Sequence, residues 1–187
     1  MESIMIVKPF IPRCALALGL ALWAAVPGEG NAQQLPVASQ GLPGYAAGAQ
    51  EVPDPGLVYK VLFDVASAGP LDKVHPGLAA AARYVNVLAE YGVPPIRRQI
   101  VIVLQGAATQ FALQSRAFAA RNHGKPNPDA AVIDAMKKAG VSVRADGQAV
   151  LAEHIALKTL LPGVQVDLSA VSTLVNLQLH GYVRIEE

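Results

Sequence analysis

The chain has 187 residues, of which 52% are hydrophobic and 16% are charged, so its composition excludes a wholly disordered protein. Its 15 basic and 14 acidic residues leave a formal net charge of +1, with neither a basic stripe nor an acidic tail. Binding to nucleic acid or to a membrane surface therefore loses most of its electrostatic driving force, and we expect neither partner.

The N-terminal segment has the pattern of an export signal. Basic residues precede an uncharged apolar run from Cys14 to Val26, and small residues at Gly30 and Ala32 indicate cleavage near Ala32. We expect a signal peptide over residues 1–32 and a periplasmic mature protein with no membrane contact. An uncleaved membrane anchor is the alternative, which the short apolar run disfavours.

Cys14 is the only cysteine of the chain, and it lies within the predicted signal. The mature protein would therefore contain no thiol. This excludes an intramolecular disulfide, and it also excludes a cysteine nucleophile or a cysteine that carries a persulfide.

Residues 33–56 are rich in Pro, Gly, Ala and Gln, and they show no apolar period. This composition predicts a flexible linker, because the segment has too few apolar side chains to order itself by burial. Tyr45 is its only aromatic residue, and we expect a solvated spacer; docking of Tyr45 is the alternative.

From Leu57 onward, strand and helix patterns alternate. The runs Val58–Ser67 and Arg98–Gly106 are almost continuously apolar, as in parallel strands that helices cover on both faces. Between them, Pro76 and Gly92 mark the start and the end of a helix. Later helices are expected over Thr109–Gly124, Asn127–Gly140, Leu151–Leu161 and Ala170–His180, and later strands over Val141–Asp146, Val164–Ser169 and Tyr182–Glu186.

This alternation predicts the fold class of residues 57–187. It is typical of an α/β domain, namely a three-layer α/β/α sandwich around a mainly parallel sheet of about five strands. In such sheets, ligands bind beyond the carboxyl ends of the strands. The candidate ligand-binding residues at these ends are Asp64, Ser67, His75, Gln105, Gly106, Thr109, Asp146, Gly147 and Gln148.

Three of these residues are also catalytic candidates. Asp64 and Asp146 could share one crevice with His75, where paired carboxylates perform acid–base chemistry or hold a cation. The alternative is purely structural, because Asp favours turns and helix N-caps for backbone reasons alone.

The sequence contains no metal or cofactor motif. The four histidines lie far apart, and none has a His partner four residues away. Gly-rich dinucleotide loops, phosphate-binding loops and the GxSxG nucleophile turn are also missing from the sequence. We therefore expect neither a metal nor a cofactor.

Four blocks of sequence carry a resemblance to a known family. They are "YKVLFDVAS", "IVIVLQGAATQFAL", "AMKKAGVSVRADGQAV" and "LLPGVQVDLSAVSTLVNLQLHGYVRIE". From Tyr59 to Glu187 the chain resembles the DsrE/DsrF-like family of small α/β proteins, which is linked to sulfur oxidation and sulfur relay. The resemblance implies a three-layer fold and a homo-oligomer, either a trimer or a hexamer.

The same resemblance bears on chemistry. Well-understood members carry sulfur as a persulfide on a cysteine in the turn after the third strand, and Asp146 stands in that place here. A carboxylate oxygen cannot form or pass on a persulfide, because that exchange needs a thiolate that attacks and leaves. The sequence thus argues against the family's sulfur chemistry.

We therefore expect an exported, non-catalytic binding or accessory protein. Its crevice at the strand ends would take a small ligand or a segment of a periplasmic partner protein. Two alternatives remain open: a sulfur-relay or sulfurtransferase-related function, and an acid–base or metal-dependent enzyme that uses Asp146 in place of the family cysteine. In a third interpretation, Asp146 does nothing but cap the next helix.

Overall fold

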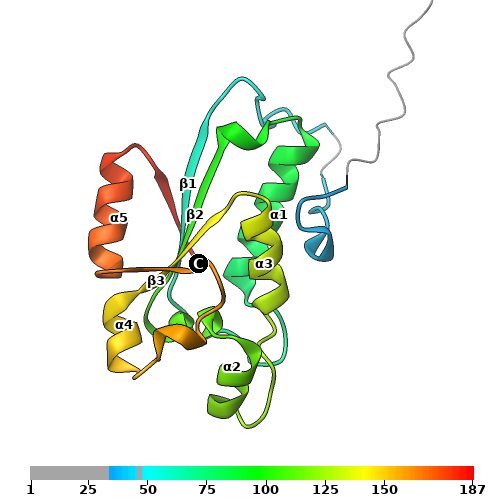
Figure 1. Ribbon diagram of the computed structural model, residues 1–187. Helices are drawn as coiled ribbons and strands as arrows, with labels where there is room; N and C mark the ends of the chain where they lie inside the picture. Colours follow the sequence, from blue (N-terminus) through cyan, green and yellow to red (C-terminus); the bar gives the residue numbers. More distant parts are fainter. Residues whose placement is uncertain (1–33, 46–47) are drawn as a thin grey trace, which may run out of the picture. The chain divides into compact units, whose positions relative to one another are not determined.

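The computed structural model describes residues 34–45 and 48–187 (Figure 1). The predicted signal peptide, including Cys14, lies outside these residues. Among the helices that these ranges form, none is long and apolar enough to cross a membrane.

Five parallel strands form the sheet, in the spatial order β4-β3-β2-β1-β5. Two adjacent inner strands, β1 and β2, are mostly apolar, and both become buried toward their carboxyl ends, as the apolar runs predict. The strands are β1 (Tyr59–Val65), β2 (Arg98–Leu104), β3 (Ser142–Asp146), β4 (Gln165–Asp167) and β5 (Val183–Glu186).

Helices cover both faces of the sheet, which confirms the predicted α/β sandwich (Figure 1). Val61, Phe63 and Val65 belong to the larger core, with apolar residues of α1 and α3. Leu62 faces the other way and packs with Leu174 of α5. The helices are α1 (Pro76–Glu90), α2 (Ser115–Arg121), α3 (Ala130–Lys138), α4 (Gly147–Ala152) and α5 (Ala170–Leu179).

The helix expected over Thr109–Gly124 is wrong as a single element. The chain forms a 3₁₀ helix, η3 (Gly106–Ala112), and then α2, with an extended break at Leu113. Leu113 forms an antiparallel bridge with Leu160, and the amide of Gln114 donates to the carbonyl of Thr159 at 2.9 Å. This non-local pairing outweighs the local preference for helix. The helix expected over Leu151–Leu161 is likewise replaced by the end of α4 and a 3₁₀ turn, η4 (Leu157–Thr159).

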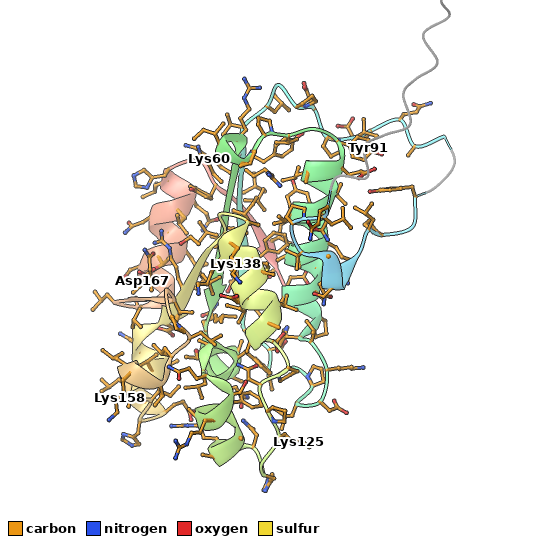
Figure 2. All side chains as sticks on the ribbon, turned by 45° about the vertical axis from the view of Figure 1, so that its right-hand side comes forward. Lys60, Tyr91, Lys125, Lys138, Lys158 and Asp167 are labelled. Carbon is orange, nitrogen blue, oxygen red and sulfur yellow. The ribbon has the colours of Figure 1, made fainter. Side chains whose placement is uncertain are left out.

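The flexible linker expected over residues 33–56 is also wrong for part of its length. Val37 is fully buried, and the side chain of Asn86 on α1 donates to the carbonyls of Val37 and Gly41 and accepts from the amide of Val37. Tyr45 packs edge-on against Tyr91, with ring centroids 6.1 Å apart. Figure 2 labels Tyr91 at the end of α1. One buried amide side chain thus orders a segment whose composition alone predicts disorder.

Candidate functional site at the carboxyl edge of the sheet

All five strands run in the same direction, so their carboxyl ends meet at one edge of the sheet. The structure places the predicted candidates at or near this edge. Their side chains form separate hydrogen-bonded groups. One group joins two strands, and two others cap helices.

Asp64 belongs to the first group, which joins β1 to β5. Its side chain is only 3% exposed, yet it is well satisfied: Arg184 of β5 donates from Nε to Oδ2 at 2.9 Å, and Gln105 donates to Oδ1. Arg184 also pairs with Glu186 at 2.7 Å. Asp64 therefore acts as the buried partner of an ion pair, which compensates the cost of burying its charge and leaves it unsuited as a free base.

His75 and Ser67 form the second group. His75 is 1% exposed and is the N-cap of α1, where its Nδ1 accepts from the amide of Gly77 at 3.1 Å. Its Nε2 lies 2.9 Å from Ser67 Oγ and 3.2 Å from the carbonyl oxygen of Ser67. Gly69 packs so closely that a Cβ there would lie 2.2 Å from the ring of His75.

These contacts assign the tautomer of His75. An amide N–H can only donate, so Nδ1 must be the acceptor, and in the neutral ring the proton is then on Nε2. That proton also suits the carbonyl of Ser67, which can only accept. A general base needs a free lone pair toward the hydroxyl that it activates, and Nε2–H offers none. Ser67 Oγ and His75 Nε2 are as close as in a catalytic serine–histidine dyad. However, Nε2 carries the proton, so it cannot accept the proton of the Ser67 hydroxyl.

Asp129 stands behind His75 and was not found by sequence reasoning. It is fully buried at the N-cap of α3, and its Oδ1 accepts from the backbone amide of His75 at 2.9 Å. Its Oδ2 has no hydrogen-bond partner among the described residues. Burial raises the pKa of Asp129 to about 6, against the lowering effect of that single hydrogen bond.

Asp146 forms the third group and caps two helices. Its Oδ1 accepts from the amide of Gln148 at the start of α4, at 3.0 Å, and from the amide of Ala170 at the start of α5, at 3.1 Å. Gly147 lies against β4 so closely that a Cβ would be 2.2 Å from the carbonyl oxygen of Asp167. The structure shows that Asp146 caps the next helix, as one interpretation of the sequence predicts, and that it also caps a second helix.

The remaining candidates lie around the end of β2. Thr109 is fully buried, and its hydroxyl donates to the carbonyl of Leu104 at 3.3 Å. Gly106 has a φ of 50° and lines a pocket of about 270 Å³. Sequence reasoning missed the polar side chains that share this pocket, because they come from separate segments of the chain. These segments are η3, the end of α2 with the residue after it, and the residue after α4, and the side chains are Gln110, Arg121, Asn122 and Glu153.

Asp64, His75 and Asp146 are therefore not brought together into one catalytic arrangement. No hydrogen bond or ion pair in residues 34–45 and 48–187 connects Asp146 to either of the other two. Within the same ranges, no group of three His, Cys, Asp or Glu residues could hold a metal ion. The carboxyl edge contains a small polar pocket, and the side chains of Asp64, His75 and Asp146 are each fixed by hydrogen bonds.

A second hollow lies between α5 and the β3–β4 side of the sheet. It measures about 420 Å³ and contains the ion pair of Arg144 with Asp167, at 3.3 Å, which Thr173 supports by donating to Asp167 at 2.7 Å. Asp167 is labelled in Figure 2. Arg144 stands in the strand "SVRAD", where its alternation with buried Val143 and Ala145 could have placed it on the α5 face.

Comparisons with known proteins support the fold and leave the function open. Neither protein-family models nor curated proteins give a match. Among solved structures, a protein of unknown function from Methanobacterium thermoautotrophicum, MTH1491, is similar with a TM-score of 0.51 and 19% sequence identity. The match covers 69% of this chain and 99% of that one. At this identity the likeness supports the α/β fold alone.

The double cap gives a test of Asp146. Replacing Asp146 with Ala removes the acceptor for two amides, and we expect a loss of about 2 kcal/mol in the free energy of unfolding. Asp146→Asn keeps Oδ1 and should lose less than about 0.5 kcal/mol. Urea unfolding of both variants measures this. Equal losses would contradict the capping role and show that the negative charge itself matters.

Asp129 predicts a pH dependence of stability. Because its pKa is raised to about 6, the folded state keeps this proton to higher pH than the unfolded state does, so folding stability falls as pH rises from about 4 to 6. The penalty above that range is about 3 kcal/mol, from about 2.2 pKa units at about 1.36 kcal/mol per unit. Asp129→Asn keeps the acceptor for His75 without the charge, so it should gain that amount relative to the wild type between pH 4 and 7. A difference that does not change with pH, in urea unfolding at several pH values, would contradict this.

Proposed function

We propose that this protein is a non-catalytic binding or accessory protein that acts as a homo-oligomer, with α5 in the contact between copies. The supporting observation is a stripe of exposed apolar side chains, the α5 stripe. It consists of Leu168, just before α5, followed by Val171, Val175 and Leu179, which are 82%, 69%, 49% and 80% exposed.

The spacing of these residues makes the stripe continuous. They recur every three or four positions, so they follow one side of the helix. The opposite side of α5 is apolar as well, because Ala170, Leu174 and Leu177 are buried against the sheet. A helix that is apolar on two sides is typical of one buried on both, and a second copy of this chain would supply the missing cover.

The edge beside the stripe fits the same proposal. Val166 of β4 is 40% exposed, and β4 is the last strand on its side of the sheet. An exposed strand edge next to an apolar helix is a natural contact surface. The proposed relationship to the DsrE/DsrF-like family also favours assembly, since its members form trimers or hexamers.

The proposal excludes sulfur transfer and acid–base catalysis at the carboxyl edge. The position of the family cysteine is held by Asp146, whose oxygen is engaged by two helix amides. The other candidates, Asp64 and His75, are held by Arg184 and by Gly77 and Ser67. We propose that the pocket beside Gly106 takes a small ligand or a partner segment, in a protein that the signal pattern directs to the periplasm.

Light scattering after size-exclusion chromatography tests the assembly. We expect the wild type to elute as a trimer or a hexamer, and Leu179→Asp to lower the mass toward that of a monomer because a charge in an apolar contact is costly. Ile96→Asp is the matched control: Ile96 is 81% exposed but belongs to the 3₁₀ turn before β2 and not to the α5 stripe. A monomeric wild type, or equal effects of the two variants, would contradict the proposal.

A further inference from the structure

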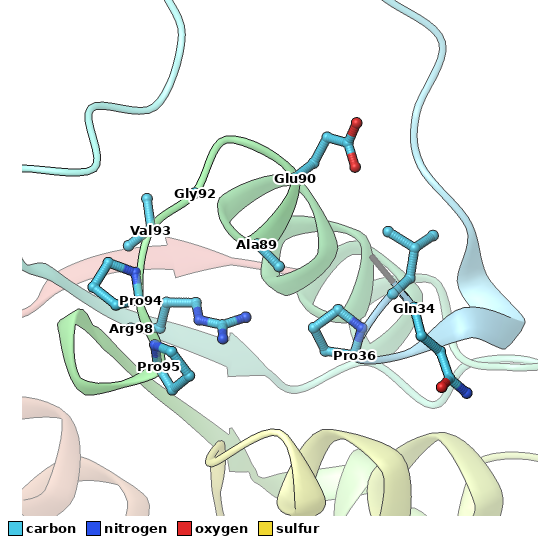
Figure 3. A pocket seen from close by; sticks show the side chains of 10 residues that line it. Gln34, Pro36, Ala89, Glu90, Gly92, Val93, Pro94, Pro95 and Arg98 are labelled. Atoms are coloured by element: carbon cyan, nitrogen blue, oxygen red, sulfur yellow. The ribbon is translucent and has the colours of Figure 1, made fainter. Parts of the chain in front are cut away.

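Another pocket lies at the other end of the sheet, where β2 begins. It measures about 460 Å³, within the range of small-molecule sites (Figure 3). Its walls come from residues 34–36, from the end of α1 and from the turn that leads into β2. The lining is mostly apolar and includes Leu35, Pro36, Ala89, Val93, Pro94 and Pro95.

One wall of this pocket is fixed by the buried side chain of Asn86. Its two bonds to Val37, at 2.8 and 2.9 Å, and one to the carbonyl of Gly41, at 2.7 Å, hold residues 34–41 against α1. The pocket is therefore shaped by a specific interaction, which gives it the preorganisation that ligand binding requires.

Arg98, the first residue of β2, projects its guanidinium into this pocket (Figure 3). Its Nε and Nη1 are buried and have no hydrogen-bond partner among the described residues. Glu90, the acidic residue of the lining, turns its carboxylate away from Arg98 (Figure 3). The last carbonyls of α1 are also engaged, because Gly92 and Val93 donate to Ala89 and Leu88.

This arrangement leaves a partly desolvated positive charge without a counter-charge. Burial lowers the pKa of Arg98, which is the direction expected for a cation that has lost water and gained no anion. Buried polar groups are nearly always paired, so an unpaired guanidinium at a pocket indicates a missing partner.

We propose that this pocket binds a small carboxylate with an apolar body, held by Arg98. The carboxylate pairs with the guanidinium, and the apolar body packs on the three prolines and Val93. A neighbouring pocket of about 410 Å³ shares Pro36, Pro95 and Arg98 and extends to Lys138, so a longer body has room to continue. This site is separate from the carboxyl edge of the sheet.

The charge of the site favours a monoanion over phosphate. Lys138 is the other basic residue in the linings of these two pockets, and its Nζ already pairs with Asp134 at 2.7 Å. A single free positive charge in an apolar lining compensates one negative charge, whereas a dianion would remain half uncompensated and lose more hydration.

Calorimetric titration of the purified full-length chain tests the proposal. The probes are sodium benzoate and sodium hexanoate, with their amides and inorganic phosphate for comparison. We expect saturable binding of at least one carboxylate, and at least tenfold weaker binding of its amide and of phosphate. Absence of saturable carboxylate binding, or equal binding of the amide, would overturn the proposal; tighter binding of phosphate would overturn the choice of ligand class.

Variants locate the site. Arg98→Gln should weaken carboxylate binding at least tenfold, whereas Arg97→Gln should not, because the Arg97 guanidinium donates to the carbonyl of Pro55. Amide chemical shifts of the wild type give a second measurement that does not depend on a variant folding. Added carboxylate should move the signals of Leu35, Ala89 and Val93, and changes confined to other residues would overturn the assignment.

Discussion

The carboxyl edge of the sheet depends on one constraint: polar groups that the fold buries there must find partners. Asp64 meets it by pairing with Arg184, which ties the last strand of the chain to the first. The same edge is closed by backbone bonds, because the amide of Glu187 donates to the carbonyl of Asp64. His75 and Asp146 meet the constraint as helix caps. Each of these three side chains is thus hydrogen-bonded within the fold.

Apart from Asp129 Oδ2, which stays without a partner behind His75, the features of the described residues that call for a partner lie elsewhere and direct attention to binding. Among residues 34–45 and 48–187, nothing covers the exposed side chains of the α5 stripe, and no anion pairs with Arg98. Both are costs in the isolated chain that an association would remove, one by burying apolar area and the other by supplying a negative charge. An accessory protein that binds a partner copy and a small acid accounts for both, without any reaction step.

Local patterns in the sequence predicted the fold well. Continuous apolar runs identified β1 and β2, and Pro76 with Gly92 bounded α1 to within about two residues. The sequence allowed Asp146 to be predicted as a helix N-cap, because an N-cap side chain bonds to a backbone amide only two or three residues further along the chain. What failed depended on distant partners: Leu113 pairs with Leu160, Val37 with Asn86, and His75 with Asp129. A single sequence gives the residue types of such pairs, but it does not show which distant residues come into contact in the folded protein.

The claim that the carboxyl edge is structural is tested most directly by the proton position on His75. Nitrogen chemical shifts of its imidazole ring, measured by NMR at pH 8, distinguish the two neutral tautomers. We expect a proton on Nε2 and an unprotonated Nδ1, because Nδ1 must accept from the amide of Gly77. A proton on Nδ1 would contradict it, because Nε2 would then be free to accept the proton of Ser67, 2.9 Å away.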